Sequence, residues 1–208
     1  MAKVAFRYLD RAQVATLMPP PADLIRIVAE GLAAHGRKDV VMPPKAHIDL
    51  DERYNGHFNV LAGWAGHIGR AGVKVTGDYV HNWRHGLPSE VALVTIYDPR
   101  SGVPLAVMDA THLTAWRTGA VTAAGARHLA PAHPRILGHI GARGSAFPNI
   151  ALLESQYAFD EVRIHILAPG LRGERHRGRP RGARARRVRG RGHHAHALRR
   201  ARRVRIER

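Results

Sequence analysis

The first part of the chain has the hydrophobic spacing of helices. Four apolar residues recur every three or four positions and would share one helix face: Leu24, Ile27, Val28 and Leu32. Prolines at positions 19–21 precede this stretch. Gly36 follows it, where a helix often ends in a left-handed residue. The pattern predicts a helix from about residue 22 to 35.

Strand-like patterns follow between residues 40 and 110. Residues 91–97 form an apolar, β-branched run, and residues 104–108 form a second apolar run. The turn-forming residues 98–102 separate the two runs, which predicts a hairpin. Asp109 or Thr111 can cap a helix that continues to about residue 129.

The spacing then predicts a strand, a glycine-rich loop, a helix and a second strand between residues 136 and 166. This order is typical of the start of a doubly wound sheet, so we predict an α/β fold. Such a loop brings backbone N–H groups to a dinucleotide pyrophosphate at the start of a helix. The candidate cofactor-binding residues are Gly141, Arg143, Gly144, Ser145 and Ala146. Arg143 occupies the place of the second glycine, so an ordinary glycine-rich turn is the alternative.

The basic residues are concentrated at the end of the chain. Of the 33 basic and 16 acidic residues, 16 arginines and two acids lie in residues 167–208. The tail therefore carries a net charge of +14, and residues 1–166 carry only +3. A tail of this composition cannot bury enough apolar surface to offset its ordering entropy, so we expect it to be disordered.

Three interpretations of the tail compete. It could be an arm that binds nucleic acid or other polyanions without sequence specificity, or a linker. It could also be an out-of-frame translation of GC-rich DNA, whose codons favour Arg, Gly, Ala, Pro and His, and this is the interpretation that we favour. The histidines at 193, 194 and 196 fit a disordered stretch better than a metal site.

Two absences narrow the function classes. The sequence contains no cysteine, which excludes disulfides, thiolate metal sites and cysteine nucleophiles. No stretch approaches the roughly 20 apolar residues needed to span a bilayer, so we expect a soluble, cytoplasmic protein without membrane contact.

Four segments in fixed order resemble one known family. They are residues 72–75 (GVKV), 86–89 (GLPS), 98–105 (DPRSGVPL) and 109–120 (DATHLTAWRTGA). These segments are similar to those of the ornithine cyclodeaminase/mu-crystallin family. The resemblance covers about residues 5–166, the first half of a typical family member.

The resemblance implies a domain organisation and a cofactor. Residues 1–130 would form an α/β substrate-binding and dimerisation domain, and residues 131–166 the first βαβ unit of a truncated Rossmann domain that binds NAD or NADP. Residues 167–208 would be the disordered basic tail. The intact protein would be a homodimer that acts on a small amino acid or cyclic imine through an iminium intermediate.

Four residues match the family's site. Arg117 would pair with the substrate carboxylate, as a planar guanidinium does well, and Lys45 would contact the same carboxylate. Lys74 would transfer protons beside the reacting amino group, and Thr118 would face the cofactor phosphates. The residues alone leave an alternative interpretation open for each of the four. Arg117 could be an exposed helix arginine, Lys45 and Lys74 could be solvated lysines, and Thr118 could be an ordinary helix threonine.

Two departures from the family limit this interpretation. The region 58–64 lacks the glutamate of true ornithine cyclodeaminases, so we do not expect ornithine cyclisation. The family's catalytic aspartate and later Rossmann strands have no counterpart, so we expect this chain to be inactive. A mu-crystallin-like protein that binds NADP and small ligands is the alternative, and a nucleic-acid-binding protein is the third candidate.

Overall fold

A computed structural model describes residues 3–142, 144–166 and 203–207. The chain divides into two compact units, Met1–Arg117 and Thr118–Arg208, which are described separately. Helix α4 (Thr111–Leu129) contributes to both units. The domain boundary expected near residue 130 stays a prediction.

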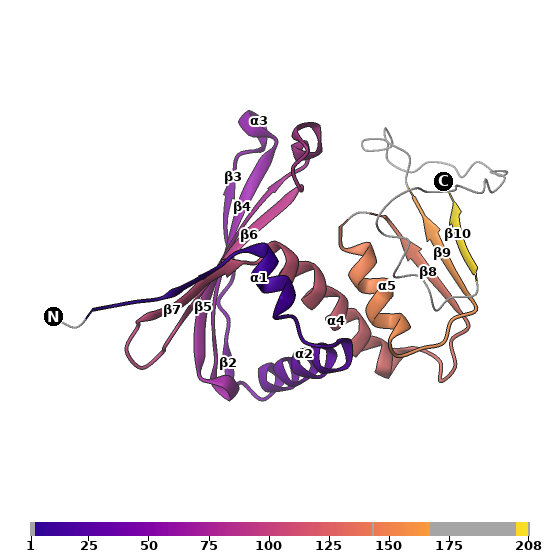
Figure 1. The fold of residues 1–208 in the computed structure, drawn as a ribbon, viewed down its shortest axis with the longest axis horizontal. Helices are drawn as coiled ribbons and strands as arrows, with labels where there is room; N and C mark the ends of the chain where they lie inside the picture. Colours follow the sequence, from indigo (N-terminus) through magenta and orange to yellow (C-terminus); the bar gives the residue numbers. More distant parts are fainter. Residues whose placement is uncertain (1–2, 143, 167–202, 208) are drawn as a thin grey trace. The chain divides into compact units, whose positions relative to one another are not determined.

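The first unit is built on a seven-stranded sheet (Figure 1). Its strands are β1 (Arg7–Leu9), β2 (Val40–Val41), β3 (Ala46–Asp49), β4 (Gly56–Ala65), β5 (Arg70–Tyr79), β6 (Glu90–Tyr97) and β7 (Pro104–Asp109). The strand order is β1-β7-β6-β5-β4-β2, and β3 pairs with β4. Only the β1–β7 pairing is parallel. The predicted hairpin of residues 91–108 is confirmed as β6–β7.

The other elements of this unit are α1 (Arg11–Thr16), α2 (Pro21–Gly36), α3 (Asp51–Tyr54), η1 (Gly66–Ile68) and η2 (Asn82–His85). The helix predicted from residue 22 to 35 is confirmed as α2. The left-handed end predicted at Gly36 is wrong, because Lys38 takes that conformation with φ 63°. In this arrangement Lys38 N–H bonds to His35 and Asp39 N–H to Ala34, which satisfies two of the helix's final carbonyls.

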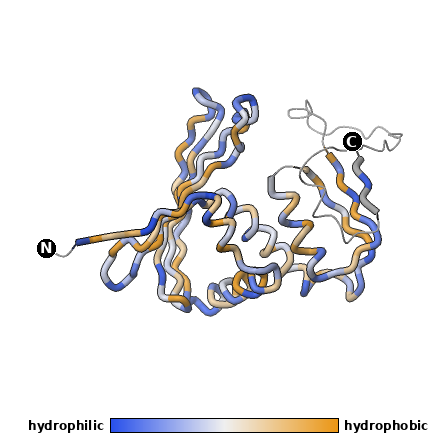
Figure 2. Tube along the Cα trace, in the orientation of Figure 1, coloured by the Kyte–Doolittle hydropathy of each residue, from blue (hydrophilic) through white to orange (hydrophobic). Residues whose placement is uncertain are grey.

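The two faces of the first unit's sheet differ in exposure. On one face Thr76 and Ala92 are buried, and the start of α4 is tied to this region because Thr111 Oγ1 accepts a hydrogen bond from Ala92 N–H. Four apolar side chains on the opposite face are 40–51% exposed: Ile48, Val75, Val91 and Leu93. Figure 2 shows the hydrophobic stretches of these strands in orange. The second face is therefore an uncovered apolar surface in the single chain.

The second unit has a parallel sheet in the order β10-β9-β8. Its elements are β8 (Ile136–Ile140), α5 (Ala146–Glu154), β9 (Glu161–His165) and β10 (Arg203–Glu207). The predicted strand–loop–helix–strand order between 136 and 166 is confirmed. Ile150, Leu152 and Val162 are fully buried and form its core. Gln156 Nε2 donates to the carbonyl of Ala123, which ties α4 to the residues that follow α5.

The expectation of a disordered tail is wrong for residues 203–207. These residues form β10, which pairs with β9 from Arg203–Glu161 to Glu207–His165. The sequence RVRIE alternates with the period of a strand, and the free edge of β9 offers backbone groups that need partners. Residues 167–202 lie outside the described residues, and so do the histidine cluster and most of the proposed polyanion-binding arm.

Candidate functional site

Lys74 lies in the middle of β5, and its Nζ donates to the hydroxyl of Thr114 on α4 at 3.3 Å. The side chain is partly buried. Burial lowers the pKa of Lys74 below its ordinary value of 10.5, the charge of Arg117 lowers it further, and Glu90 opposes both. A lysine with a lowered pKa gives up its proton more readily than a solvated lysine, which suits it to proton transfer.

Arg117 follows Thr114 by one helical turn on α4 and is exposed. Its charge acts on Lys74, so the structure brings these two predicted site residues close together. Two neighbouring cations repel each other unless an anion lies between them. The pair therefore has the charge and donor set to hold a carboxylate.

Lys45 is exposed and directly precedes β3. Ala46 pairs with Val60, and Leu61 pairs with Lys74 across β4–β5. Lys45 therefore lies opposite Leu61, and the strand β4 separates it from Lys74 on β5. A contact of Lys45 with the substrate stays a prediction.

In the glycine loop between β8 and α5, the backbone at Gly141 has a conformation that residues with side chains rarely adopt. Gly141 has a φ of 97°, and its N–H donates to the carbonyl of His165 at 2.8 Å. A Cβ added at Gly141 or Gly144 would meet only open space, so a ligand can approach the backbone there. Ser145 makes no side-chain cap at the start of α5, where Ala146 is the first residue. These features fit a bound phosphate.

For Arg143 and Thr118, two further residues of the predicted cofactor site, the structure gives no test of a contact with the cofactor. Arg143 lies outside the described residues. Thr118 lies on α4, where its carbonyl accepts a bond from the hydroxyl of Thr122. The predicted contact of Thr118 with cofactor phosphates stays a prediction.

The sequence analysis did not assign roles to Thr114, Thr76, Asp78 or Glu90. The polar residues Lys74, Thr76 and Asp78 stand at every second position of the sequence. Because the side-chain period of a strand is two, this alternation could have revealed that they share one face of β5. The contact with Thr114 could not be read from the pattern, because it joins residues forty positions apart.

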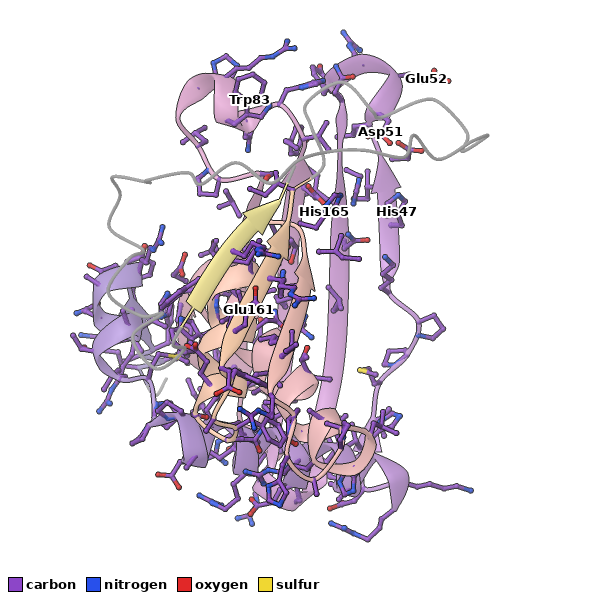
Figure 3. All side chains as sticks on the ribbon, turned by 90° about the vertical axis from the view of Figure 1, so that its right-hand side faces the viewer. His47, Asp51, Glu52, Trp83, Glu161 and His165 are labelled. Atoms are coloured by element: carbon purple, nitrogen blue, oxygen red, sulfur yellow. The ribbon has the colours of Figure 1, made fainter. Side chains whose placement is uncertain are left out.

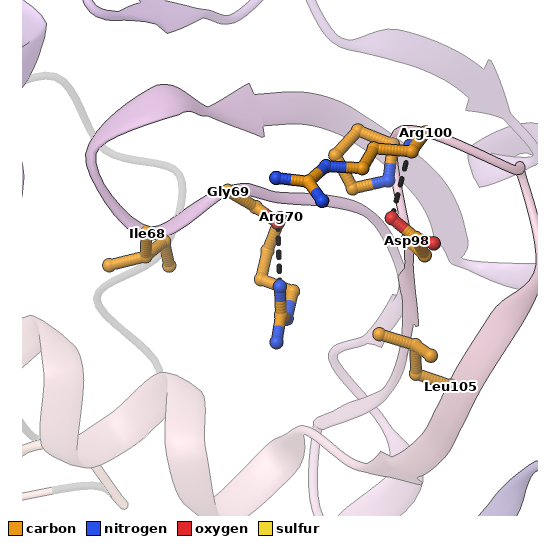
Figure 4. Close-up of a pocket in the computed structure, with 7 residues that line it drawn as sticks. Ile68, Gly69, Arg70, Asp98, Arg100 and Leu105 are labelled. Atoms are coloured by element: carbon orange, nitrogen blue, oxygen red, sulfur yellow. Dashed lines mark hydrogen bonds between the residues drawn. The ribbon is translucent and has the colours of Figure 1, made fainter.

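An open hollow of about 460 Å³ lies elsewhere in the first unit, beside Arg70, Asp98, Arg100 and Leu105 (Figure 4). The carboxylate of Asp98 accepts hydrogen bonds from Arg100 N–H and the Ser101 hydroxyl, both within its own turn. Arg70 donates to the carbonyl of Gly69. None of the predicted site residues lines this hollow.

In the part of the chain that the structure describes, no group of three or more His, Asp or Glu side chains could hold a metal ion. Likewise, none of the helices described is both long and apolar enough to cross a membrane.

The sheet with its lysine–arginine pair and the parallel unit with its glycine loop define an α/β protein suited to anionic ligands. The chain belongs to the ornithine cyclodeaminase/mu-crystallin family, whose family model matches residues 7–174. The resemblance seen in the sequence is thereby confirmed.

Curated relatives of this chain match it over only part of their own length. The nodulation efficiency protein NfeD of Rhizobium meliloti is 34% identical over 158 residues, which cover 76% of this chain and 49% of the relative. An alanine dehydrogenase of Archaeoglobus fulgidus is 30% identical over 143 residues, 69% of this chain and 43% of the relative. The chain thus spans about half the length of the curated relatives it matches.

Among solved structures, the chain is similar to the Δ1-pyrroline-2-carboxylate reductase of Thermococcus litoralis in complex with NADH and L-proline. The TM-score is 0.75 at 26% identity, over 79% of this chain and 50% of that one. An archaeal alanine dehydrogenase dimer with bound NAD gives a TM-score of 0.72 at 28% identity, over 77% and 48% of the two chains.

Proposed function

We propose that this chain is the substrate-binding and first nucleotide-binding part of an NAD(P)-dependent enzyme that acts on an α-amino acid or cyclic imine through an iminium intermediate. The observation that carries the proposal is the cluster of Lys74, Thr114 and Arg117 in the first unit. Relatives named alanine dehydrogenase, iminosuccinate reductase and ketimine reductase mu-crystallin support this reaction class.

Each residue of the cluster has a separate task. The guanidinium of Arg117 pairs with the substrate carboxylate, and Lys45 adds a second cation on the same side. Thr114 accepts a bond from Lys74 Nζ and so fixes the direction of the ammonium group. Lys74, with its lowered pKa, holds or releases a proton at the substrate nitrogen.

NAD or NADP would lie against the loop of Gly141, Gly144 and Ser145, as the first βαβ unit of a Rossmann domain. The open space at both glycines and the φ of Gly141 support this placement. A bound nicotinamide supplies the hydride acceptor or donor for the reaction.

Cofactor binding is tested by titrating the 208-residue chain with NADH and NADPH in a calorimeter. Gly141→Ala forces a side chain into a backbone conformation that L residues rarely adopt, so we expect at least about ten-fold weaker binding. Gly138→Ala in β8 is the matched control, because its Cβ also meets open space but its φ is ordinary. Equal affinities for the two variants would contradict the placement of the cofactor on this loop.

Substrate binding is tested with Arg117→Ala. Loss of a charged hydrogen-bonded pair typically costs about 1.5–3 kcal/mol, or roughly ten- to 150-fold in amino-acid affinity. Arg37→Ala removes an exposed arginine at the end of α2 and should leave the affinity unchanged. If Arg117→Ala also leaves it unchanged, Arg117 is a helix-surface residue.

We further propose that the uncovered apolar face of the first unit joins two copies of this chain. The exposed side chains of Val75, Val91 and Leu93 support this, because apolar patches on one sheet face commonly mark interfaces. Leu93→Asp should convert a dimer to a monomer in sedimentation experiments. Leu129→Asp, on an 87% exposed leucine of α4, is the control and should leave the dimer intact.

A further inference from the structure

The open hollow of about 460 Å³ in the first unit lies at the ends of two hairpins of the sheet (Figure 4). The β4–β5 hairpin contributes residues 68–70, and the β6–β7 hairpin contributes residues 98–100 and Leu105. Small-molecule sites in proteins have volumes of roughly 300–1,000 Å³, so the hollow is large enough for a ligand. Neither Lys74 nor Arg117 belongs to it, so this ligand would be a second one.

Two guanidinium groups line the hollow, one from each hairpin (Figure 4). Arg70 donates one hydrogen bond to the carbonyl of Gly69. Neither Arg70 nor Arg100 forms an ion pair with a carboxylate among the residues that the structure describes. Because a guanidinium carries five N–H donors in a planar fork, both side chains keep donors for a ligand that carries an acidic group.

Asp98 is the acidic residue of the hollow, and its carboxylate is already bonded within its own turn. One oxygen accepts from Arg100 N–H at 3.0 Å, and the other accepts from the Ser101 hydroxyl at 2.8 Å. These two bonds lower the pKa of Asp98 below its ordinary value of 3.8, and the charges of Arg100 and Arg70 lower it further. Both cations therefore lie near one carboxylate, and the lining keeps a net positive charge.

Apolar side chains form the rest of the lining. Ile68 is 60% exposed and Leu105 is 37% exposed, and Pro99 belongs to the same surface. In the view of Figure 4, Ile68 and Leu105 lie on either side of Arg70. A ligand that covers these side chains removes apolar area from water, which favours binding, while the cations fix the position of its acidic group.

We propose that this hollow binds a small monocarboxylate with an apolar chain, at a site separate from that of the amino-acid substrate. The carboxylate pairs with the guanidinium groups of Arg70 and Arg100, because its two oxygens match the parallel N–H groups of an arginine. The apolar chain lies against Ile68 and Leu105. A single negative charge balances two cations and one acid, so a monocarboxylate fits this lining better than a dianion.

The test is calorimetric titration of the 208-residue chain with octanoate, acetate and 1-octanol. Acetate has the carboxylate without the chain, and octanol has the chain without the charge. We expect octanoate to bind with saturation at least about ten-fold more tightly than either, because it alone makes both the charged pairs and the apolar contacts.

A double variant tests the charged contacts. Arg70→Gln/Arg100→Gln should weaken octanoate binding at least about ten-fold and leave the affinity for octanol unchanged. The matched control is Arg37→Gln/Arg53→Gln, which removes the same charge from exposed positions elsewhere. Arg37 follows α2, and Arg53 lies on α3 at the exposed tip that carries Asp51 (Figure 3). This control should bind octanoate like the unmodified chain.

A second variant tests the apolar contacts without changing the charge. Ile68→Ala shortens a side chain of the hollow and should weaken octanoate binding several-fold while leaving the affinity for acetate unchanged. Because Ile68 is 60% exposed, this substitution removes little of the folded chain's own packing. Ile27→Ala, at a 47% exposed isoleucine of α2, is the control and should leave both affinities unchanged.

The outcomes separate this inference from the proposed function. Absence of saturable octanoate binding, or equal affinities for octanoate and octanol, would overturn the inference. It is also wrong if octanoate binds the Arg70/Arg100 double variant as tightly as the unmodified chain. Loss of octanoate binding in Arg117→Ala, with binding kept in the double variant, would place the carboxylate at the proposed substrate site instead. Failure of NADH to bind would contradict the proposed function and leave the expected octanoate result unchanged.

Discussion

The ammonium nitrogen of Lys74 lies 3.3 Å from the hydroxyl oxygen of Thr114, a residue forty positions further along the chain. The bond joins a central strand to the first turns of α4, and both residues belong to the first unit. Since the ammonium group is partly buried, the hydroxyl replaces part of the hydration that the charge has lost. This relationship gives two predictions, one for each partner.

Thr114→Val should destabilise the chain by about 1–2 kcal/mol, because it removes the acceptor of a bond from a charged donor and leaves that donor partly desolvated. Urea unfolding at neutral pH measures the change. Thr122→Val is the matched control on the same helix, since its hydroxyl makes only a 3.4 Å bond on an exposed surface. Equal effects of the two substitutions would show that the bond to Lys74 adds nothing to stability.

The lowered pKa of Lys74 makes stability depend on pH in a definite direction. Between the lowered pKa of the folded state and the ordinary value of 10.5, the unfolded chain binds more protons than the folded chain. The free energy of unfolding contributed by this residue therefore rises with pH across that window and is constant below it. The free energy of unfolding of the unmodified chain, relative to that of Lys74→Met, should therefore rise as the pH becomes alkaline.

Urea unfolding at several pH values between neutral and about 10 tests this dependence. Lys3→Met, at an exposed lysine near the start of the chain, supplies the control series. A difference for Lys74→Met that does not change with pH would mean that the pKa of Lys74 is the same in the folded and unfolded states.

Two glycines of α4 should respond in opposite directions to alanine. A Cβ at Gly119 would lie 2.8 Å from the carbonyl oxygen of Pro148, a backbone atom that cannot move aside. Gly119→Ala should therefore destabilise the chain by about 1–3 kcal/mol. Gly125→Ala meets nothing within 4 Å and should stabilise it by up to about 1 kcal/mol through helix propensity. Thermal unfolding of both variants, measured together, would show the contrast, and two effects of the same sign would contradict the close packing at Gly119.

The sequence was most informative where structure is determined locally. The spacing of apolar residues predicted α2, and the turn at residues 98–102 predicted the β6–β7 hairpin, because both depend on near neighbours. The end of α2 was misjudged at Gly36. Glycine is favoured in the left-handed conformation but is not required there, and Lys38 adopts it with two stabilising backbone bonds.

The candidate site was less predictable, because it depends on register. The family resemblance pointed to Lys74 and Arg117, but only the pairing of β4, β5 and β6 shows that Thr76, Asp78 and Glu90 extend the same face. A shift of one residue in that pairing would move these side chains to the opposite face. β10 was missed for a different reason: the basic composition of the tail concealed a five-residue strand period at residues 203–207.

Pairing of β10 with β9 should protect the amides of β9 from hydrogen exchange. As the middle strand of β10-β9-β8, β9 has hydrogen-bonded neighbours on both sides, so removing residues 203–208 leaves one edge of β9 exposed to water. Amides in such an edge exchange through small local openings. We expect about ten-fold faster exchange, equivalent to about 1.4 kcal/mol, for the β9 amides that face β10.

A point substitution separates backbone pairing from the loss of charge that accompanies truncation. Ile206→Pro removes a backbone N–H and disfavours a strand, whereas Ile206→Val keeps the N–H and the strand propensity. The proline variant should reproduce the faster exchange at β9, and the valine variant should not. Because β8 pairs with the other edge of β9, amides that face β8 should keep their protection in both variants. Unchanged exchange throughout β9 after truncation would show that β10 does not pair in solution, and the original expectation of disorder would then hold for residues 203–207 as well.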